Sequence, residues 1–226
     1  MATMAAFQGA FPLALLFIVI GAVFDFFDGM SARLLHVSSP IGKELDSLAD
    51  VVTFGVAPSA LVSEFLVRIT ATPLSAFSFS NPDVWLQLLS YVPYLMAAFS
   101  ALRLAKFNLD ERQTMGFIGL PTPANALFWG ALVVGPGAYV EQMEWSPIPL
   151  YVTAAMTLFS CYLLVSEIPM FALKFKHWGW KGNEVKYIFV ISAIALIAYF
   201  GIGGIAVAIA WYVVLSILTW KLKPSR

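Results

Sequence analysis

The chain has 226 residues, of which 60% are hydrophobic and only 12% are charged, and its mean hydropathy is +0.83. Ordinary soluble domains are about half apolar and about a quarter charged, so the composition argues against a water-soluble globule. The 13 basic and 13 acidic residues cancel, which gives no indication of a polyelectrolyte partner such as a nucleic acid. The single cysteine, Cys161, excludes an internal disulfide and a cysteine-based zinc site.

Long apolar stretches follow one another along almost the whole chain. A helix needs about 20 mostly apolar residues to cross a bilayer, and helix after helix lacks the polar face that a soluble bundle would have. We therefore expect an all-α, polytopic transmembrane bundle of about seven spans that forms a single integral-membrane domain, residues 1–226. In chain order the spans are residues 10–34, 46–68, 84–106 (split by Pro93), 122–140, 148–166, 185–201 and 203–220.

Basic residues gather in alternate loops of this topology. One side of the predicted bundle carries 12 of the 13 Lys and Arg residues, and the other side has only Arg68. The positive-inside rule assigns the basic side to the cytoplasm, which places the N-terminus outside and the C-terminus inside. The basic segments are residues 33–45, 103–121, 167–186 and 221–226.

Four aspartates stand at the cytoplasmic ends of the first two spans. Asp25 and Asp28 are one helical turn apart, and so are Asp46 and Asp50. A short connection makes the two helices antiparallel neighbours, so all four carboxylates can converge on one point. Because each carboxylate costs about 2.5–3.5 kcal/mol in a membrane segment and like charges repel, the cluster needs a compensating partner.

Divalent cations meet this need. Oxygen ligands without His or Cys suit Mg²⁺ or Mn²⁺, and shared carboxylates would hold two ions about 3.5–4 Å apart. Gly29 lets a ligand approach the backbone, Ala32 shares the Asp25/Asp28 face, and Gly42 lies one turn before Asp46. Arg33 can clamp a phosphate with its guanidinium. Metals together with an arginine indicate a diphosphate site.

Two other interpretations of the acidic residues compete with a metal site. Single aspartates at the end of a span are often only interfacial, but four at these spacings, with Gly and Arg between them, are poorly explained in that way. Intramembrane carboxylates also mark ion paths in cation transporters and channels. A transporter predicts acids spread across the bilayer on several helices, whereas these cluster at one end of two helices.

The stretch Asp25–Asp50 resembles the signature of the CDP-alcohol phosphotransferases, D-x₂-D-G-x₂-A-R-x₈-G-x₃-D-x₃-D, at every fixed position. Members of this family are integral membrane enzymes, usually homodimers, that displace CMP from a CDP-linked substrate with an alcohol. They begin with a further helix that contributes to the nucleotide site, and residues 1–9 resemble only the end of that helix. By resemblance we therefore expect the family's first helix to be missing, with seven spans in place of eight.

The same resemblance implies roles for individual residues. Two divalent ions, Mg²⁺ or Mn²⁺, would be held by Asp25, Asp28, Asp46 and Asp50. Asp50 would also act as the base for the attacking hydroxyl group. The CDP diphosphate would be bound by Asp28, Gly29, Ala32, Arg33 and Gly42.

Later motifs are similar to the phosphatidylserine synthases of this family, namely residues 46–58, 103–108 and 119–123. Thr53 continues the Asp46/Asp50 face at α-helical spacing and offers a hydroxyl one turn from Asp50. Arg103 and Lys106 end the third span level with the cluster, where a cation could bind a carboxylate or a phosphate, although both could also be ordinary positive-inside residues. Asn108 could donate and accept hydrogen bonds. The candidates for binding the acceptor are thus Thr53, Arg103, Lys106 and Asn108.

The reaction expected from the resemblance transfers the phosphatidyl group of CDP-diacylglycerol to L-serine, giving phosphatidylserine and CMP. The nearest alternatives keep this chemistry and use glycerol 3-phosphate or inositol phosphate, whose own phosphate would need more cations near the site. The acyl chains stay in the bilayer, so the site must lie at the membrane interface. We expect an integral protein of a prokaryotic cytoplasmic membrane with its site facing the cytoplasm.

Overall fold

The structure is a computed structural model that describes residues 1–36, 39–70, 84–109, 117–140, 148–171, 173, 179–180 and 182–222. Among these, only the backbone is described for Arg33, Phe117, Val140, Lys221 and Leu222. Of the predicted basic residues, Arg112, Lys174, Lys176, Lys181, Lys223 and Arg226 lie outside the described residues.

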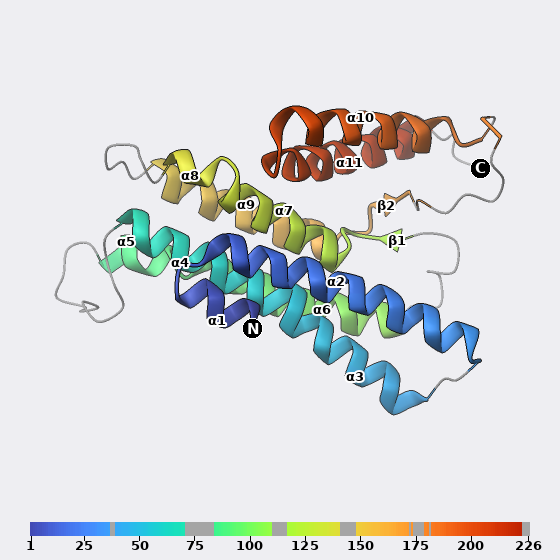
Figure 1. The fold of residues 1–226 in the computed structure, drawn as a ribbon, viewed down its shortest axis with the longest axis horizontal. Coiled ribbons are helices and arrows are strands. Elements are labelled where there is room, and N and C mark those ends of the chain that lie inside the picture. Colours follow the sequence, from blue (N-terminus) through green and yellow to red (C-terminus); the bar gives the residue numbers. More distant parts are fainter. Residues whose placement is uncertain are drawn as a thin grey trace.

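The described chain is almost entirely helical, as the composition predicts (Figure 1). Its one short pairing joins β1 (Phe117–Ile118) antiparallel to β2 (Pro169–Met170). In chain order the helices are α1 (Ala2–Phe7), α2 (Phe11–Leu34), α3 (Pro40–Asp50), the π-helix η1 (Val51–Val56), α4 (Ala57–Thr70), α5 (Val84–Leu89), the 3₁₀-helix η3 (Val92–Tyr94), α6 (Leu95–Leu109), α7 (Thr122–Val134), α8 (Gly137–Val140), α9 (Ile148–Val165), α10 (Glu184–Phe200) and α11 (Gly203–Leu222).

Each predicted span coincides with a helix or with a run of consecutive helices. Five of these are long and apolar enough to cross a membrane, namely Phe11–Ala32, Pro40–Thr70, Val84–Leu109, Ile148–Val165 and Gly203–Trp220. The two other predicted spans contain shorter helices, since α7 has 13 residues and α10 has 17. Glycines set both limits: the backbone at Gly135, which follows α7, packs closely on Gly203, and Gly201 follows α10 with φ +59°. The prediction of an all-α polytopic membrane protein is confirmed, with a span count that depends on these two helices.

The helices run roughly along the long axis of the molecule, so the bundle has two ends (Figure 1). The facing ends of α2 and α3, the strand pairing and the end of α11 lie at one end, whereas α5 and α8 lie at the other. This is the alternation that the distribution of basic residues predicts. We call the first of these the aspartate end, because Asp25, Asp28, Asp46 and Asp50 lie toward it.

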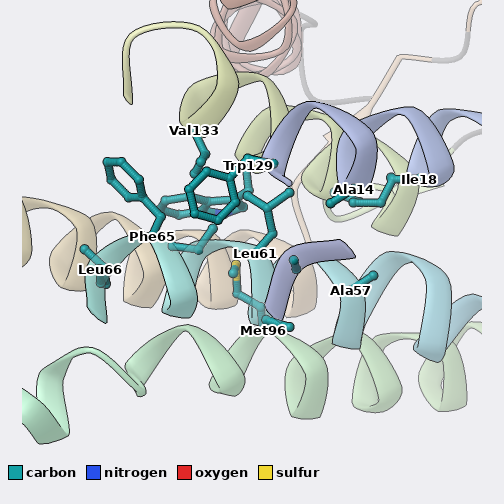
Figure 2. Close-up of a cluster of buried hydrophobic side chains, with 14 of the residues drawn as sticks. Ala14, Ile18, Ala57, Leu61, Phe65, Leu66, Met96, Trp129 and Val133 are labelled. Atoms are coloured by element: carbon teal, nitrogen blue, oxygen red, sulfur yellow. The ribbon is translucent and has the colours of Figure 1, made fainter. Parts of the chain in front are cut away.

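The hydrophobic core lies where α4 meets α2, α6 and α7 (Figure 2). Leu61 of α4 is fully buried between Trp129 of α7 and Met96 of α6. Ile18 of α2 belongs to the same buried cluster. Ten of the 14 residues of α4 are buried, whereas α3, which precedes it in the same continuous helix, has no buried residue. One half of this long helix therefore anchors the bundle, and the other half carries the aspartates at its surface.

Polar side chains inside the core are paired with one another. The indole Nε1 of Trp129 donates to Ser160 Oγ at 3.1 Å, and the Ser160 hydroxyl donates to Asn125 Oδ1. The Asn125 amide nitrogen in turn lies 3.8 Å from the sulfur of Met96. Because buried polar groups need such partners, this chain of contacts fixes α7 against α9 and α6.

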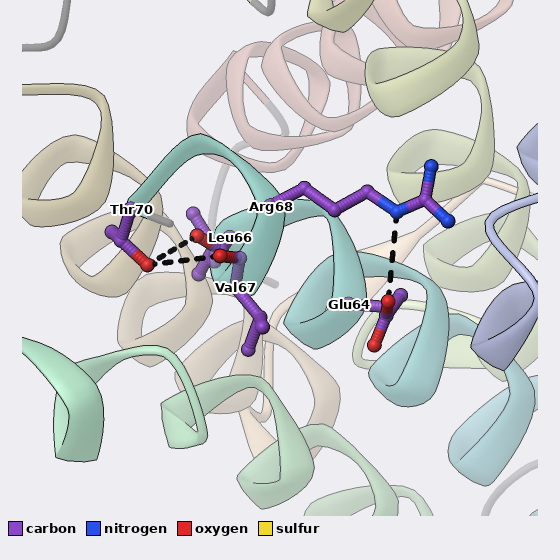
Figure 3. A network of polar contacts seen from close by, with 5 residues as sticks. All are labelled: Glu64, Leu66, Val67, Arg68 and Thr70. Atoms are coloured by element: carbon purple, nitrogen blue, oxygen red, sulfur yellow. Dashed lines mark hydrogen bonds and ion pairs between the residues drawn. The ribbon is translucent and has the colours of Figure 1, made fainter. Parts of the chain in front are cut away.

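At the end of the bundle away from the aspartates, polar contacts join residues within the last turns of α4 (Figure 3), and Arg68 also contacts Phe11 at the beginning of α2. Arg68 Nε lies 3.5 Å from Glu64 Oε1, and the guanidinium covers the ring of Phe11 at 5.0 Å from its centroid. A side chain at Gly9, whose φ is +70°, would collide with the guanidinium. The Thr70 hydroxyl closes the last turn of α4 by donating to the carbonyl of Leu66 at 2.9 Å. Arg68, the one basic residue predicted for this side, is thus part of the packing.

We predict that Ser160→Ala destabilises the protein by about 1–3 kcal/mol, because it leaves the Trp129 N–H and the Asn125 carbonyl buried without their partner. The matched control is Thr157→Val on the same helix, where the hydroxyl bonds only to the carbonyl of Thr153. Thermal unfolding in detergent measures both. A loss of stability in Ser160→Ala no larger than in the control would contradict this role.

Candidate active site

Helix α2 presents the first pair of aspartates near its end. Asp25 is half-buried, whereas Asp28 and Gly29 are exposed. No atom lies within 4 Å of the position that a Cβ would take at Gly29, so the backbone there borders open space. Ala32 is exposed on the next turn, and Arg33 follows it in α2. A ligand can therefore approach this stretch of backbone closely, as the sequence predicts.

Helix α3 begins at a cap that gives Gly42 a local role. Ser39 is the N-cap residue, and its Oγ accepts a hydrogen bond from the Gly42 N–H at 3.0 Å. A Cβ at Gly42 would lie 2.9 Å from this oxygen, so glycine lets the cap close. Pro40 in the first turn has no N–H to satisfy there. The cap starts the helix about two turns before Asp46, and the predicted contact of Gly42 with a diphosphate stays a prediction.

A π-helix begins immediately after Asp50. The six residues of η1 have the wider π spacing, so the α-helical spacing assumed for Thr53 from the sequence is wrong. The Thr53 methyl lies where α2 passes closest, since a Cβ at Gly21 would be 2.5 Å from it. Single π-helical turns occur frequently at functional sites. The absence of a side chain at Gly21 allows this close approach of α2 to η1, and the proposed contact of Thr53 with an acceptor remains untested.

The aspartates of the two helices lie within electrostatic reach of one another. Asp25 is repelled by Asp46 and Asp28, and Asp50 is repelled by Asp25 and Asp46. Within the described residues, however, no three His, Cys, Asp or Glu side chains are grouped closely enough to hold a metal ion. The donor set itself fits a divalent ion, because it consists of hard carboxylate oxygens whose mutual repulsion such an ion would remove. The carboxylates of α2 and α3 therefore lie farther apart than the ligands of one ion would. Their repulsion favours this separation, because α3 has no buried residue that packs it against α2.

Arg103 is the buried cation of this site. Only 7% of Arg103 is exposed, and its charge interacts with those of Asp50 and of Tyr212 in α11. Its guanidinium also lies 6.0 Å from the centroid of the Phe107 ring. Lys106, in contrast, is exposed. Of the two predicted cations, Arg103 is therefore the one that the fold buries beside Asp50.

Asn108 holds α3 against α6. Its amide nitrogen donates to Ser47 Oγ at 3.0 Å, and its backbone carbonyl accepts from Lys43 Nζ at 3.1 Å. Ser47 lies directly after Asp46, so these bonds position the helix of the second aspartate pair. The sequence predicted Asn108 as a ligand of the acceptor but contained no signal for this pairing, because residues 61 positions apart meet only in the fold.

Residues 1–220 match the family of CDP-alcohol phosphatidyltransferases, and the chain belongs to this family. It is thus an integral membrane protein of a class of enzymes that transfer groups from CDP-alcohols and use divalent metal ions. The aspartate pattern and the helical membrane fold, described above, agree with this class.

Several relatives share one printed name, CDP-diacylglycerol–serine O-phosphatidyltransferase. The chain is 38% identical to the Bacillus subtilis protein over 165 residues, which cover 73% of this chain and 75% of that protein. It is 30% identical to a Helicobacter pylori protein over 212 residues, which cover 93% and 80% of the two chains. It is also 60% identical to the Saccharomyces cerevisiae protein over 135 residues, but these cover only 56% of this chain and 41% of that one.

We predict that Asn108→Ala raises the concentration of divalent metal needed for half-maximal activity about tenfold, a size typical of residues that orient metal ligands. The physical reason is that α3, with Asp46 and Asp50, loses its bond to α6. Ser47→Ala removes the same bond and should reproduce the effect, whereas Lys106→Ala should leave the metal requirement unchanged. A metal titration of activity measures all three variants. A raised KM for the acceptor at an unchanged metal requirement would instead identify Asn108 as a ligand of the acceptor.

Proposed function

We propose that this enzyme transfers the phosphatidyl group of CDP-diacylglycerol to L-serine and releases phosphatidylserine and CMP. The observation that carries the proposal is the similarity over 212 residues, 93% of the chain, to a protein named for this reaction. The electrostatically coupled aspartates at one end of two apolar helices support it. A lipid substrate keeps its acyl chains in the bilayer while its headgroup reaches such a site.

In this proposal Asp25, Asp28, Asp46 and Asp50 hold two divalent cations, Mg²⁺ or Mn²⁺. Such cations would supply positive charge to neutralise the diphosphate and the departing CMP. The open backbone at Gly29 supports a diphosphate beside α2. The residues that would bind the diphosphate are Asp28, Gly29, Ala32, Arg33 and Gly42.

The chain's own groups carry out the proton transfer and the positioning. The serine hydroxyl oxygen forms a bond to the phosphorus that bears the diacylglycerol, the bond from this phosphorus to the CMP oxygen breaks, and the hydroxyl proton passes to Asp50. Asp50 is half-buried directly before η1, and its charge interacts with that of the Arg103 guanidinium. Arg103 is the acceptor ligand that this arrangement favours, and Thr53, Lys106 and Asn108 are the other candidates.

The proposal extends to the setting of the enzyme. The whole chain, residues 1–226, acts as one integral-membrane domain in a prokaryotic cytoplasmic membrane, with the aspartate end facing the cytoplasm. The location of Lys43, Arg103 and Lys106 at that end, opposite Arg68, supports this orientation. The enzyme acts as a homodimer, as the family resemblance implies.

The purified chain in detergent with Mn²⁺ or Mg²⁺ is expected to release CMP from CDP-diacylglycerol when L-serine is added. A chelator should abolish the release and either ion should restore it, because the carboxylates alone leave the diphosphate charge unbalanced. Chromatographic measurement of CMP, with glycerol 3-phosphate and inositol phosphate as parallel acceptors, tests this. Release of CMP with one of these acceptors but not with serine would support transfer of the phosphatidyl group and refute serine as the acceptor.

We predict that Asp50→Asn lowers kcat about 100-fold or more, since a positioned general base contributes about 10²–10⁴-fold. The variant should fold with an equal or higher Tm, because it removes the repulsion of Asp50 by Asp25 and Asp46. Glu44→Gln, an equivalent change at an exposed position of the same helix, is the matched control and should keep its activity. Near-normal turnover of Asp50→Asn would exclude Asp50 as the base.

A further inference from the structure

Two adjoining cavities lie toward the end of the bundle away from the aspartates. The larger cavity, of about 250 Å³, is lined by residues of α4, α7 and α9 and by the turn before α8. The smaller cavity, of about 190 Å³, lies between the beginning of α2, α4 and the segment from α7 to α8. Phe65 and Val133 line both cavities, which therefore meet at these two side chains (Figure 2).

The larger cavity is apolar and open on the side of α9. Its polar side chains are Thr153 and the indole of Trp129, whose N–H is already bonded to Ser160. Ile148 and Val152 of α9 line it and are exposed, so a hydrocarbon chain can enter from the bilayer without crossing water. An apolar cavity of about 150 Å³ already binds benzene in place of water. The larger volume here therefore favours an apolar ligand.

The smaller cavity holds a cation in a fixed position. Arg68, in the last turn of α4, is the one charged residue that lines it among the described residues. The Glu64 carboxylate lies 3.5 Å from Arg68 Nε, and the guanidinium covers the ring of Phe11 (Figure 3). The terminal nitrogens lie beside Gly9, which also lines the cavity. Since a guanidinium has five N–H donors, its pairing with Glu64 leaves donors for an anion.

The cation and the apolar cavity are arranged in a fixed order along α4. Val62, Phe65 and Arg68 follow one another at intervals of three residues, which places them on neighbouring turns. Arg68 lies nearest to the end of the helix, at the level where arginines reach lipid headgroups. The apolar cavity lies one to two turns deeper, beside Val62 and Phe65. A phospholipid has the same order, with its phosphate at the headgroup level and its acyl chains below.

One aromatic contact connects the two parts. The ring of Phe11 lies under the Arg68 guanidinium at 5.0 Å and packs edge-on against Phe65, with 6.1 Å between the ring centroids. Phe65 in turn lines the apolar cavity. The guanidinium is thus held next to the place where the cavities meet, and one ligand can contact both.

We propose that these two cavities form a binding site for an anionic phospholipid of the leaflet away from the aspartate end. The phosphate accepts charge-assisted hydrogen bonds from the Arg68 guanidinium, and one acyl chain occupies the apolar cavity beside Trp129. The lipid is anionic because the described lining of the smaller cavity contains a cation and no carboxylate. The site lies toward the other end of the bundle from Asp25–Asp50, so a lipid bound there takes no part in the proposed reaction.

The first test measures retained lipid by native mass spectrometry of the full chain in detergent. Dioleoyl phosphatidylglycerol and dioleoyl phosphatidylcholine are added in equal amounts, with a chelator present so that no metal bridges a lipid to the aspartates. The wild type should retain phosphatidylglycerol about tenfold better, and Arg68→Gln should lose this preference because a hydrogen bond between charged groups is lost. Lys186→Gln, which removes a positive charge near the start of α10, is the control and should behave as the wild type.

The second test fills the apolar cavity and leaves Arg68 in place. Val152→Phe adds bulk at an exposed lining position, and Val207→Phe makes the same change at an exposed position of α11 that lines neither cavity. Retention of phosphatidylglycerol should fall about tenfold in Val152→Phe and stay normal in Val207→Phe. Phosphatidylglycerol should also raise the Tm of the wild type and both controls, but not of Val152→Phe or Arg68→Gln.

Each possible outcome supports or overturns the site. Equal retention of the two lipids by the wild type, or an equal loss of preference in Lys186→Gln and Arg68→Gln, would overturn it. Normal retention by Val152→Phe would limit the contact to the guanidinium and also overturn it. If Arg68→Gln is unstable in detergent alone, Val152→Phe decides the question. Because neither test uses turnover, a failure here leaves the proposed function unaffected, and a lack of serine-dependent CMP release leaves this site unaffected.

Discussion

Repulsion between carboxylates on two apolar helices is the constraint that the rest of this structure must accommodate. Asp25 and Asp28 on α2 face Asp46 and Asp50 at the end of α3, and several of these charges repel one another. Such charges are costly at the end of membrane helices, so the helices must be held together by contacts elsewhere. The close approach of Gly21 to Thr53 and the hydrogen bond from Asn108 to Ser47 are two of these contacts.

The two halves of the long helix of residues 40–70 have different roles, since one half packs in the core and the other carries two of the aspartates. Its second half, α4, is buried against α2, α6 and α7 and forms the centre of the core (Figure 2). Its first half, α3, has no fully buried residue and carries the exposed Asp46 and the half-buried Asp50. The π-helix η1 joins the two halves. Because a π-helix has more residues per turn than an α-helix, it changes the direction in which the side chains before it point relative to those after it. Rigid packing of α4 thus sets the position of aspartates that do not pack themselves.

Arg103 connects this charged surface to the interior. It compensates part of the negative charge of Asp50 and interacts electrostatically with Tyr212, whose hydroxyl donates to the carbonyl of Phe171 at 2.9 Å. Tyr212 also packs against Phe171 and Phe189, which belong to the strand β2 side and to α10. The hairpin of α10 and α11, remote in sequence from the aspartates, therefore bears on the environment of the proposed base.

The sequence by itself determined the class of fold, the positions of the helices and the aspartate pattern. A bilayer requires long apolar stretches and penalises charge, so both leave a clear record in the order of residues. The tertiary structure decided the π-helix after Asp50, the short extents of α7 and α10, the pairing of Asn108 with Ser47 and the burial of Arg103. Each of these depends on contacts between residues far apart in the chain, and helical periodicity within one segment carries no information about which partner a side chain will meet.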